Sequence, residues 1–360
     1  MRIVLKALML LISVGLLNIV ACKKQADFDK KSMLTGIIND YVLPSYQELQ
    51  VDNQALEAAC ISFGNTRTMA QLEIMQNAWK KSMQSWSRVE MLVFGPGRTN
   101  YRYTQLDNTP IKSISIENSI SDTTTIDSIY IAGRSSYTKG LASIEYLLFD
   151  ENNDQVALLG LYQTDINKDR RFAYLLNCIK NTNALIRTIE SEWRNAYGKT
   201  LSEGTGNTSQ EGIASFSNAV VHMSQTLAAK KLAKPLGKES VDQLVHPEYL
   251  ESPYAHFSWD IILYNLQGIQ QMFGTTERGL GSYLTYLIND ETPTNRIVEQ
   301  AKKVEILIKA RQLTMLDDLT GDTAAVEEIY QEMRALYTDI SNNISTYFSI
   351  TILANPDDGD

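Results

Sequence analysis

The sequence predicts an all-α protein made of two packed helical bundles. Along most of the chain, apolar residues recur three, four and seven positions apart, as they do on one face of an amphipathic helix. Helix-stop signals end these segments, among them Gly95-Pro96, Gly198 and Gly274. A run rich in Gly, Ser and Thr at residues 202–209 has the composition of a linker, and long helical patterns lie on both sides of it.

The predicted organisation in chain order is a signal peptide (residues 1–21), an N-terminal helical half (22–201), the linker (202–209) and a C-terminal helical half (210–360). The helices expected in the N-terminal half are Lys30–Gln50 with a kink at Pro44, Ala55–Phe63, Met69–Phe94, Tyr137–Phe149 and Asn167–Tyr197. Those expected in the C-terminal half are Gln210–Lys231, Phe257–Phe273, Leu280–Asn289, Asn295–Met315 and Ala324–Phe348.

One segment departs from helical periodicity. Ile111–Gly133 is rich in Ser, Thr, Ile and Asp, and its apolar residues alternate at Ile114/Ile116 and Ile129/Ile131. Alternation with a period of two is typical of a strand. We therefore expect a long loop or a small hairpin inserted between bundle helices.

The N-terminus has the pattern of a lipoprotein signal. Arg2 and Lys6 precede an apolar run that ends at Ile19-Val-Ala-Cys22. In this pattern Cys22 is lipidated and becomes the mature N-terminus, which anchors the protein to a membrane. The alternative is an uncleaved transmembrane anchor, but the apolar run is short for the roughly 20 residues that spanning requires.

Charge and cysteine content indicate which partners, which cellular location and which cysteine chemistry to expect. Without the signal peptide the chain has 31 basic and 42 acidic residues, a net charge of −11, which argues against nucleic acid as a partner. Lys23-Lys24 after Cys22 is not an acidic export tag, which favours an outer-membrane lipoprotein facing the periplasm. Cys60 and Cys178 are expected to form either one disulfide or two isolated buried thiols.

A glutamate lies where an apolar side chain is expected. In Tyr137–Phe149, Glu145 shares a helical face with Leu141, Ile144 and Leu148. A carboxylate on a buried stripe is costly unless a cation, a proton or hydrogen-bond donors compensate it. It is either a structural residue, held by one buried Arg or by backbone donors, or part of a functional site.

A second carboxylate also lies on an apolar helical face. Trp79 and Trp86 are seven positions apart, and Glu90 follows Trp86 by four, so Glu90 lies on the face of the two tryptophans. In the C-terminal half, Ser258 and Asn265 are also seven apart and are expected to face inward.

These segments resemble the imelysin-like family of bacterial periplasmic and surface proteins. The resemblance rests on Trp79, Trp86 and Glu90 before Gly95-Pro96; on Lys139-Gly140 before Glu145-Tyr-Leu-Leu-Phe149; on Lys234-Pro-Leu-Gly237; on Glu251-Ser-Pro-Tyr254; on Asn265-Leu-Gln-Gly268; and on Asp357-Asp-Gly-Asp360. It runs in chain order from about Trp79 to the C-terminus. The family signature is Gly-x-His-x-x-Glu, and this chain has Gly140, Ala142 and Glu145, so the histidine is absent.

The resemblance implies a helical architecture with a functional site between the halves, a historical peptidase label and a link to bacterial iron uptake. A metallopeptidase needs about three protein ligands and an activated water, and with Ala142 in place of the histidine no complete metal motif remains. Two buried carboxylates suit a hard cation, so iron or another divalent cation is the candidate cofactor. Among the three histidines, His256 is the candidate ligand, because it lies next to Ser258 and four residues before Asp260.

The sequence thus predicts a lipid-anchored binding protein, active in iron or nutrient acquisition, that holds its ligand between the two helical halves. The candidate site residues for that ligand are Glu90, Glu145, Arg134, Ser258 and Asn265, and those for a metal are Glu90, Glu145 and His256. The alternatives are a metal-dependent peptidase and a catalytically inert lipoprotein that binds an outer-membrane protein partner.

Overall fold

The computed structural model describes residues 27–206, 208 and 211–354, which form helices and contain no β-strand. Cys22 and the predicted signal peptide lie outside these residues, as do Asp357–Asp360. Within the described part, no helix is both long enough and apolar enough to cross a membrane. The all-α prediction is confirmed.

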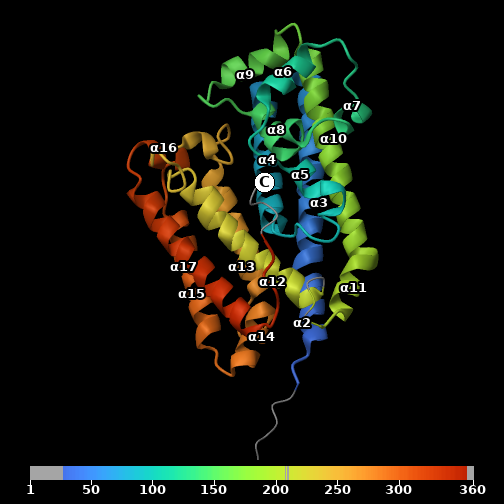
Figure 1. The fold of residues 1–360 in the computed structure, drawn as a ribbon. Helices are drawn as coiled ribbons and strands as arrows, with labels where there is room; N and C mark the ends of the chain where they lie inside the picture. The colour runs from blue at the N-terminus through green and yellow to red at the C-terminus, as the bar shows by residue number, and fades with distance from the viewer. Residues whose placement is uncertain (1–26, 207, 209–210, 355–360) are drawn as a thin grey trace, which may run out of the picture.

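Helices from the first part of the chain form one bundle (blue to green in Figure 1), in which α3, α4 and α10 pack side by side along their lengths and α8 packs against α4 and α10. Its elements are α2 (Lys30–Gly36), the π-helical η2 (Ile37–Val42), α3 (Leu43–Thr66), α4 (Met69–Val89), α8 (Gly140–Leu148), α10 (Lys168–Glu192), the π-helical η5 (Trp193–Tyr197) and α11 (Gly198–Glu203). Short elements connect them: η3 (Thr99–Tyr101), α5 (Arg102–Leu106), α6 (Ser113–Ser121), α7 (Ser128–Ala132), η4 (Ser136–Thr138) and α9 (Gln155–Gln163).

Helices from the second part of the chain form the other bundle (yellow to red in Figure 1), in which α12, α13, α15 and α17 pack together. Its elements are α12 (Gly212–Thr226), the π-helical η6 (Leu227–Ala233), η7 (Pro247–Tyr249), α13 (Ser258–Phe273), α14 (Gly279–Ile288), α15 (Thr292–Lys309), α16 (Met315–Thr320) and α17 (Ala324–Tyr347). Contacts between α4 and α13 join the bundles. The division of the chain at residues 202–209 stays a prediction.

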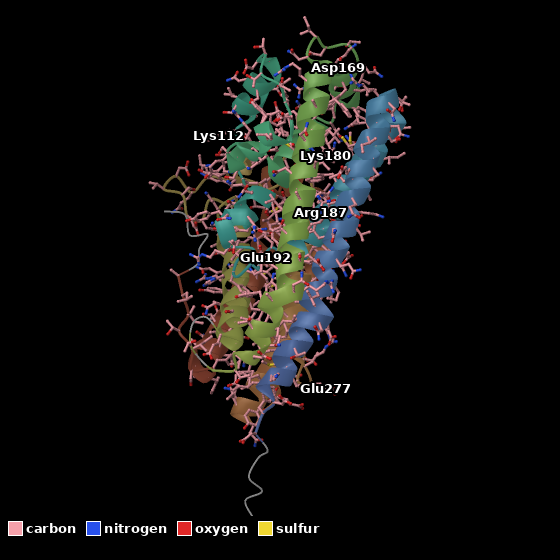
Figure 2. All side chains as sticks on the ribbon, turned by 90° about the vertical axis from the view of Figure 1, so that its right-hand side faces the viewer. Lys112, Asp169, Lys180, Arg187, Glu192 and Glu277 are labelled. Carbon is pink, nitrogen blue, oxygen red and sulfur yellow. The ribbon has the colours of Figure 1, made fainter. Side chains whose placement is uncertain are left out.

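The face of α10 turned away from the second bundle is charged. Figure 2 shows Asp169, Lys180 and Arg187 along it, and all three side chains are exposed. The opposite face of α10 buries Tyr174, Cys178 and other residues in the core. The helix is therefore amphipathic, as its sequence pattern predicts.

Two helices predicted separately are one. Lys30–Gln50 and Ala55–Phe63 were expected with a gap between them, but α3 continues from Leu43 to Thr66. The polar residue Asn53 in that gap is buried, and its backbone oxygen accepts a hydrogen bond from Asn183 of α10 (3.3 Å). At the kink predicted for Pro44, the chain passes from the π-helical turn η2 directly into α3, and Pro44 lies in the first turn of α3.

The expected loop or hairpin at Ile111–Gly133 is wrong, because this segment contains the helices α6 and α7. In a strand, positions i and i+2 lie on the same face, whereas in a helix they lie on nearly opposite faces. Accordingly Ile116 and Ile131 are buried, whereas Ile114 is 76% exposed and Ile129 is 81% exposed. The alternation was real, but it came from one inward and one outward isoleucine in each short helix.

The core residues predicted from the tryptophan pattern are confirmed. Trp79 and Leu148 are fully buried and Trp86 is 3% exposed. The indole nitrogen of Trp79 donates to the carbonyl oxygen of Leu141 at 2.9 Å, which ties α4 to α8. Cys60 and Cys178 are both buried and free, so the disulfide alternative is wrong and the two-thiol alternative is correct.

Candidate functional site

Glu90 and a lysine that the sequence analysis did not select form the centre of a polar cluster between the bundles. Glu90 directly follows α4, and Lys231 lies in η6 with a side chain that is 7% exposed. Both carboxylate oxygens of Glu90 accept hydrogen bonds from the Lys231 ammonium at 3.0 Å. The stripe argument therefore identified a carboxylate that is only partly exposed, and the charge of a buried lysine compensates it.

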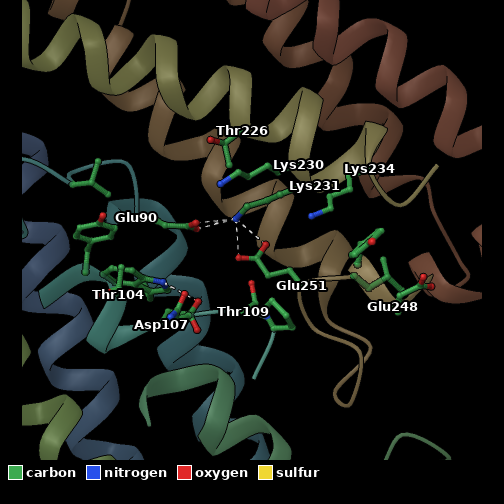
Figure 3. A pocket seen from close by; sticks show the side chains of 17 residues that line it. Glu90, Thr104, Asp107, Thr109, Thr226, Lys230, Lys231, Lys234, Glu248 and Glu251 are labelled. Atoms are coloured by element: carbon green, nitrogen blue, oxygen red, sulfur yellow. Dashed lines mark hydrogen bonds and ion pairs between the residues drawn. The ribbon is translucent and has the colours of Figure 1, made fainter. Parts of the chain in front are cut away.

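Five oxygen atoms surround the Lys231 ammonium. Besides the two of Glu90, Glu251 provides Oε1 at 2.9 Å and Oε2 at 2.8 Å, and Asn265 provides Oδ1 at 2.7 Å. Figure 3 shows Glu90 and Glu251 converging on this ammonium from different segments. Burial acts to lower the pKa of Lys231, but the carboxylates of Glu251 and Glu90 together outweigh it and raise the pKa above its ordinary value, so the amine stays charged.

Asn265 connects the cluster to both bundles. Its amide nitrogen donates to the carbonyl oxygen of Ser87 (2.6 Å) and to Glu90 Oε2 (2.7 Å), while its oxygen accepts from Lys231. One turn further along α13, a Cβ at Gly268 would lie 2.4 Å from the carbonyl oxygen of Arg88. Glycine at 268 thus permits the close approach of α13 to α4 that places the Asn265 amide against Glu90.

Glu145 is buried, but it is held in a different way. Its Oε1 atom accepts three hydrogen bonds, from Ser252 Oγ (2.8 Å), Tyr254 N (3.0 Å) and Ala255 N (2.8 Å). Ser258 supports this loop, because its hydroxyl accepts from the backbone N–H of Ser252 at 3.1 Å. Burial raises the pKa of Glu145 to about 7, against the lowering effect of these hydrogen bonds. The three hydrogen bonds to Glu145 thus connect α8 with the loop before α13.

Asp107 is a further carboxylate that the sequence analysis missed. It follows α5, and it accepts hydrogen bonds from the Trp86 indole (3.2 Å) and the backbone N–H of Ala142 (3.0 Å). The residue at the signature histidine position, Ala142, therefore lies against this carboxylate. Removal from water raises the pKa of Asp107 well above its ordinary value, and the charges of Glu251 and Glu90 add to the effect.

A cavity of about 240 Å³ opens beside the cluster. Residues between Trp86 and Pro110 contribute one part of its wall, and residues between Thr226 and Glu251 contribute the other. Figure 3 shows Lys230, Lys231 and Lys234 on one side, facing Thr104, Asp107 and Thr109 on the other. Polar groups of both signs thus converge on one enclosed space, which is typical of a ligand site.

The predicted site residue Arg134 lies elsewhere. The Arg134 guanidinium lies over the ring of Tyr130, 5.2 Å from its centroid, and within the described residues it makes no hydrogen bond or ion pair with Glu90 or Glu145. The described residues contain no group of three or more His, Cys, Asp and Glu side chains that could hold a metal ion. In them Glu90 binds the Lys231 ammonium and Glu145 binds the loop before α13, and the metal site expected from Glu90, Glu145 and His256 stays a prediction.

The missed lysine had a signal in the sequence. Lys231 is four positions after Leu227 and three after Ala228, both of which are buried. The argument that selected Glu90, a charge on an apolar helical face, applies equally to Lys231. Asp107 and Glu251 had no such signal, because they lie in irregular segments where periodicity gives no information.

The fold and this cluster define an all-helical protein with a charged cavity between two bundles. The family model described as Imelysin (peptidase M75) matches residues 42–346, and the chain belongs to this family. Iron-regulated protein A of Synechococcus elongatus is 25% identical over 129 residues, which are 36% of this chain and 34% of that protein. The match thus spans about a third of that relative's length.

Two crystal structures share the fold. A candidate iron-regulated protein A precursor from Parabacteroides distasonis has a TM-score of 0.74 at 16% identity. An imelysin-like protein from Psychrobacter arcticum has a TM-score of 0.75 at 19% identity. Each comparison covers 91% of this chain and 97% of the other. At these identities the likeness concerns the fold alone.

Proposed function

We propose that this imelysin-family protein is a lipid-anchored binding protein of the cell envelope, and that it serves iron acquisition by holding a ligand between its two bundles. The observation that carries the proposal is the cavity beside the Lys231 cluster, whose wall comes from both parts of the chain. Iron-regulated protein A, the name of the Synechococcus relative, supports the iron-related role. The lipobox ending at Cys22 supports the anchor at the outer membrane facing the periplasm.

A bare metal ion fits this site poorly. The oxygens that would attract a hard cation, those of Glu90, Glu251 and Asn265, already surround the Lys231 ammonium. A second cation among them would meet the positive charge of Lys231 at close range. The ligand is therefore an organic molecule or a chelate, and the peptidase alternative gains no support from the arrangement of side chains.

The test is growth under iron limitation. A strain without the gene is complemented with the wild type, with Thr104→Trp, which fills the cavity, or with Thr99→Trp as a matched control. Both threonines bond a nearby backbone oxygen (Thr104 to Tyr101, Thr99 to Gly95), but only Thr104 lines the cavity. We expect the wild type and Thr99→Trp to restore growth and Thr104→Trp to fail, with all three proteins equally helical by circular dichroism.

The anchor is tested in the same strain. Cys22→Ala removes the thiol that is lipidated, so we expect the protein to leave the membrane fraction.

Full growth with Thr104→Trp would refute ligand binding in the cavity. An unmodified Cys22 in membrane-extracted protein, shown by mass spectrometry, would refute the anchor. Growth that is independent of the gene under iron limitation would leave a partner-binding role as the better explanation.

A further inference from the structure

The cavity contains two positive charges that the cluster does not use. Lys230 and Lys234 flank Lys231 in sequence and line the same cavity. Within the described residues, no carboxylate lies within the 4.0 Å of an ion pair from either ammonium. Lys231, in contrast, is fully engaged by Glu90, Glu251 and Asn265.

The surroundings of these lysines suit an anion. The Lys234 ammonium lies 4.3 Å from the centroid of the Tyr249 ring, an arrangement that leaves its N–H donors available. The Thr109 hydroxyl and the second N–H of the Asn108 amide, whose first N–H donates to Ser136, line the cavity and can donate hydrogen bonds. Hydrogen bonds from ammonium groups to carboxylate or phosphate oxygens are short and strong, and a partly enclosed site screens them less than open solvent does.

We propose that the cavity binds a small oxyanion of the carboxylate or phosphate class through the ammonium groups of Lys230 and Lys234. The inference rests on the proposed function, since it takes the cavity as the ligand site, and it adds the chemistry of the ligand. A polycarboxylate that chelates Fe³⁺ presents such oxygens while it carries the metal. A chelate of this kind reconciles an iron-related role with a site whose own oxygens already surround a lysine.

The sequence contains further carboxylates near its C-terminus. The described C-terminal residues follow α12 towards the cavity: Asn218 donates to the carbonyl oxygen of Thr351, and His222, one turn nearer to Lys230, pairs with that of Leu353 (2.9 Å). The sequence after Ala354 contains Asp357, Asp358 and Asp360, which lie outside the described residues. The experiment therefore includes a variant that ends at Ala354.

Binding is measured by isothermal titration calorimetry with four probes: citrate, Fe³⁺-citrate, inorganic phosphate and, as a control, chloride. The wild type and the variant ending at Ala354 are compared with Lys230→Gln/Lys234→Gln. We expect citrate or phosphate to bind, and the double replacement to weaken binding about a hundredfold, since the loss of one charge-assisted hydrogen bond typically costs about tenfold. Tighter binding of citrate identifies a carboxylate ligand, and tighter binding of phosphate identifies a phosphate ligand.

The matched control is Lys180→Gln/Lys199→Gln, which removes the same charge from exposed positions on α10 and α11. Equal losses in the two double variants would show non-specific attraction and overturn the inference. So would the absence of binding in both the wild type and the variant ending at Ala354. If no oxyanion binds but Thr104→Trp still fails to restore growth, the inference falls and the proposed function stands. If Thr104→Trp restores growth, the proposed function itself falls.

Discussion

Replacing Lys231 by Met tests whether the cluster is held together by its internal cation. The substitution removes the ammonium and leaves the carboxylates of Glu90 and Glu251 facing each other. Their side chains are 18% and 13% exposed, so water compensates them only in part. Breaking a buried ion pair by removing one partner costs roughly 3–5 kcal/mol. Because the carboxylates keep some access to water, we expect about 3 kcal/mol here.

Chemical denaturation measures this loss directly, and at about 2 °C per kcal/mol for a chain of this size Tm should fall by about 6 °C. Lys309→Met is the control, because Lys309 pairs with Glu305 on an exposed helical face and should cost under about 1 kcal/mol. The variant Lys231→Met/Glu90→Gln/Glu251→Gln removes all three charges and should recover most of the stability.

The pH dependence gives a second check. The penalty in Lys231→Met comes from two uncompensated negative charges, so it should shrink as the pH is lowered and the carboxylates take up protons. A loss no larger than that of Lys309→Met would refute the reasoning. So would a triple variant as unstable as the single one.

The remaining predictions concern three other sites. Burial raises the pKa of Glu145 to about 7, so its contribution to stability is present below about pH 4.5 and is lost as the pH rises through 7. Relative to Glu145→Gln, the wild type should therefore lose about 3 kcal/mol of unfolding free energy between about pH 4.5 and 8. A difference between the two proteins that does not change with pH would contradict this. Trp79→Ala should cost roughly 3–5 kcal/mol in chemical denaturation because Trp79 is fully buried, whereas Ile74→Ala, at a position 51% exposed, should cost under about 1 kcal/mol. Burial raises the pKa of Cys60 to about 12 and that of Cys178 above its ordinary value, so a thiol reagent should label neither cysteine until the protein unfolds. Rapid labelling of the native protein would instead show that the thiols are accessible.

Helix identity could be predicted from the sequence because it depends on local spacing. The faces of Trp79 and Trp86, and those of Ser258 and Asn265, are all buried as their seven-residue spacing indicates. Short segments were predicted less well. Ile114 and Ile116 are two positions apart, as on one face of a strand, but in the structure only Ile116 is buried and Ile114 is exposed. A pair of apolar residues does not show whether both of them face the core, so it does not choose between strand and helix.

The site could be predicted only in part. A charge on an apolar stripe must be compensated by another group, and this argument identified Glu145, which is buried, and Glu90, which is partly buried. The sequence pattern does not show which group compensates that charge. Glu90 binds Lys231, which is 141 positions away, and Glu145 binds a loop more than 100 positions away.

The sequence by itself determined the helical class, the family and the two carboxylates on apolar stripes, because all of these follow from residue types and their spacing along the chain. The tertiary structure decided which groups meet those carboxylates. It placed the Lys231 ammonium where the sequence suggested a metal, and it set Asp107 against Ala142. The reason is physical: hydrogen bonds and ion pairs act over about 3 Å in space, and the packing of α13 against α4 brings together residues that no local pattern connects.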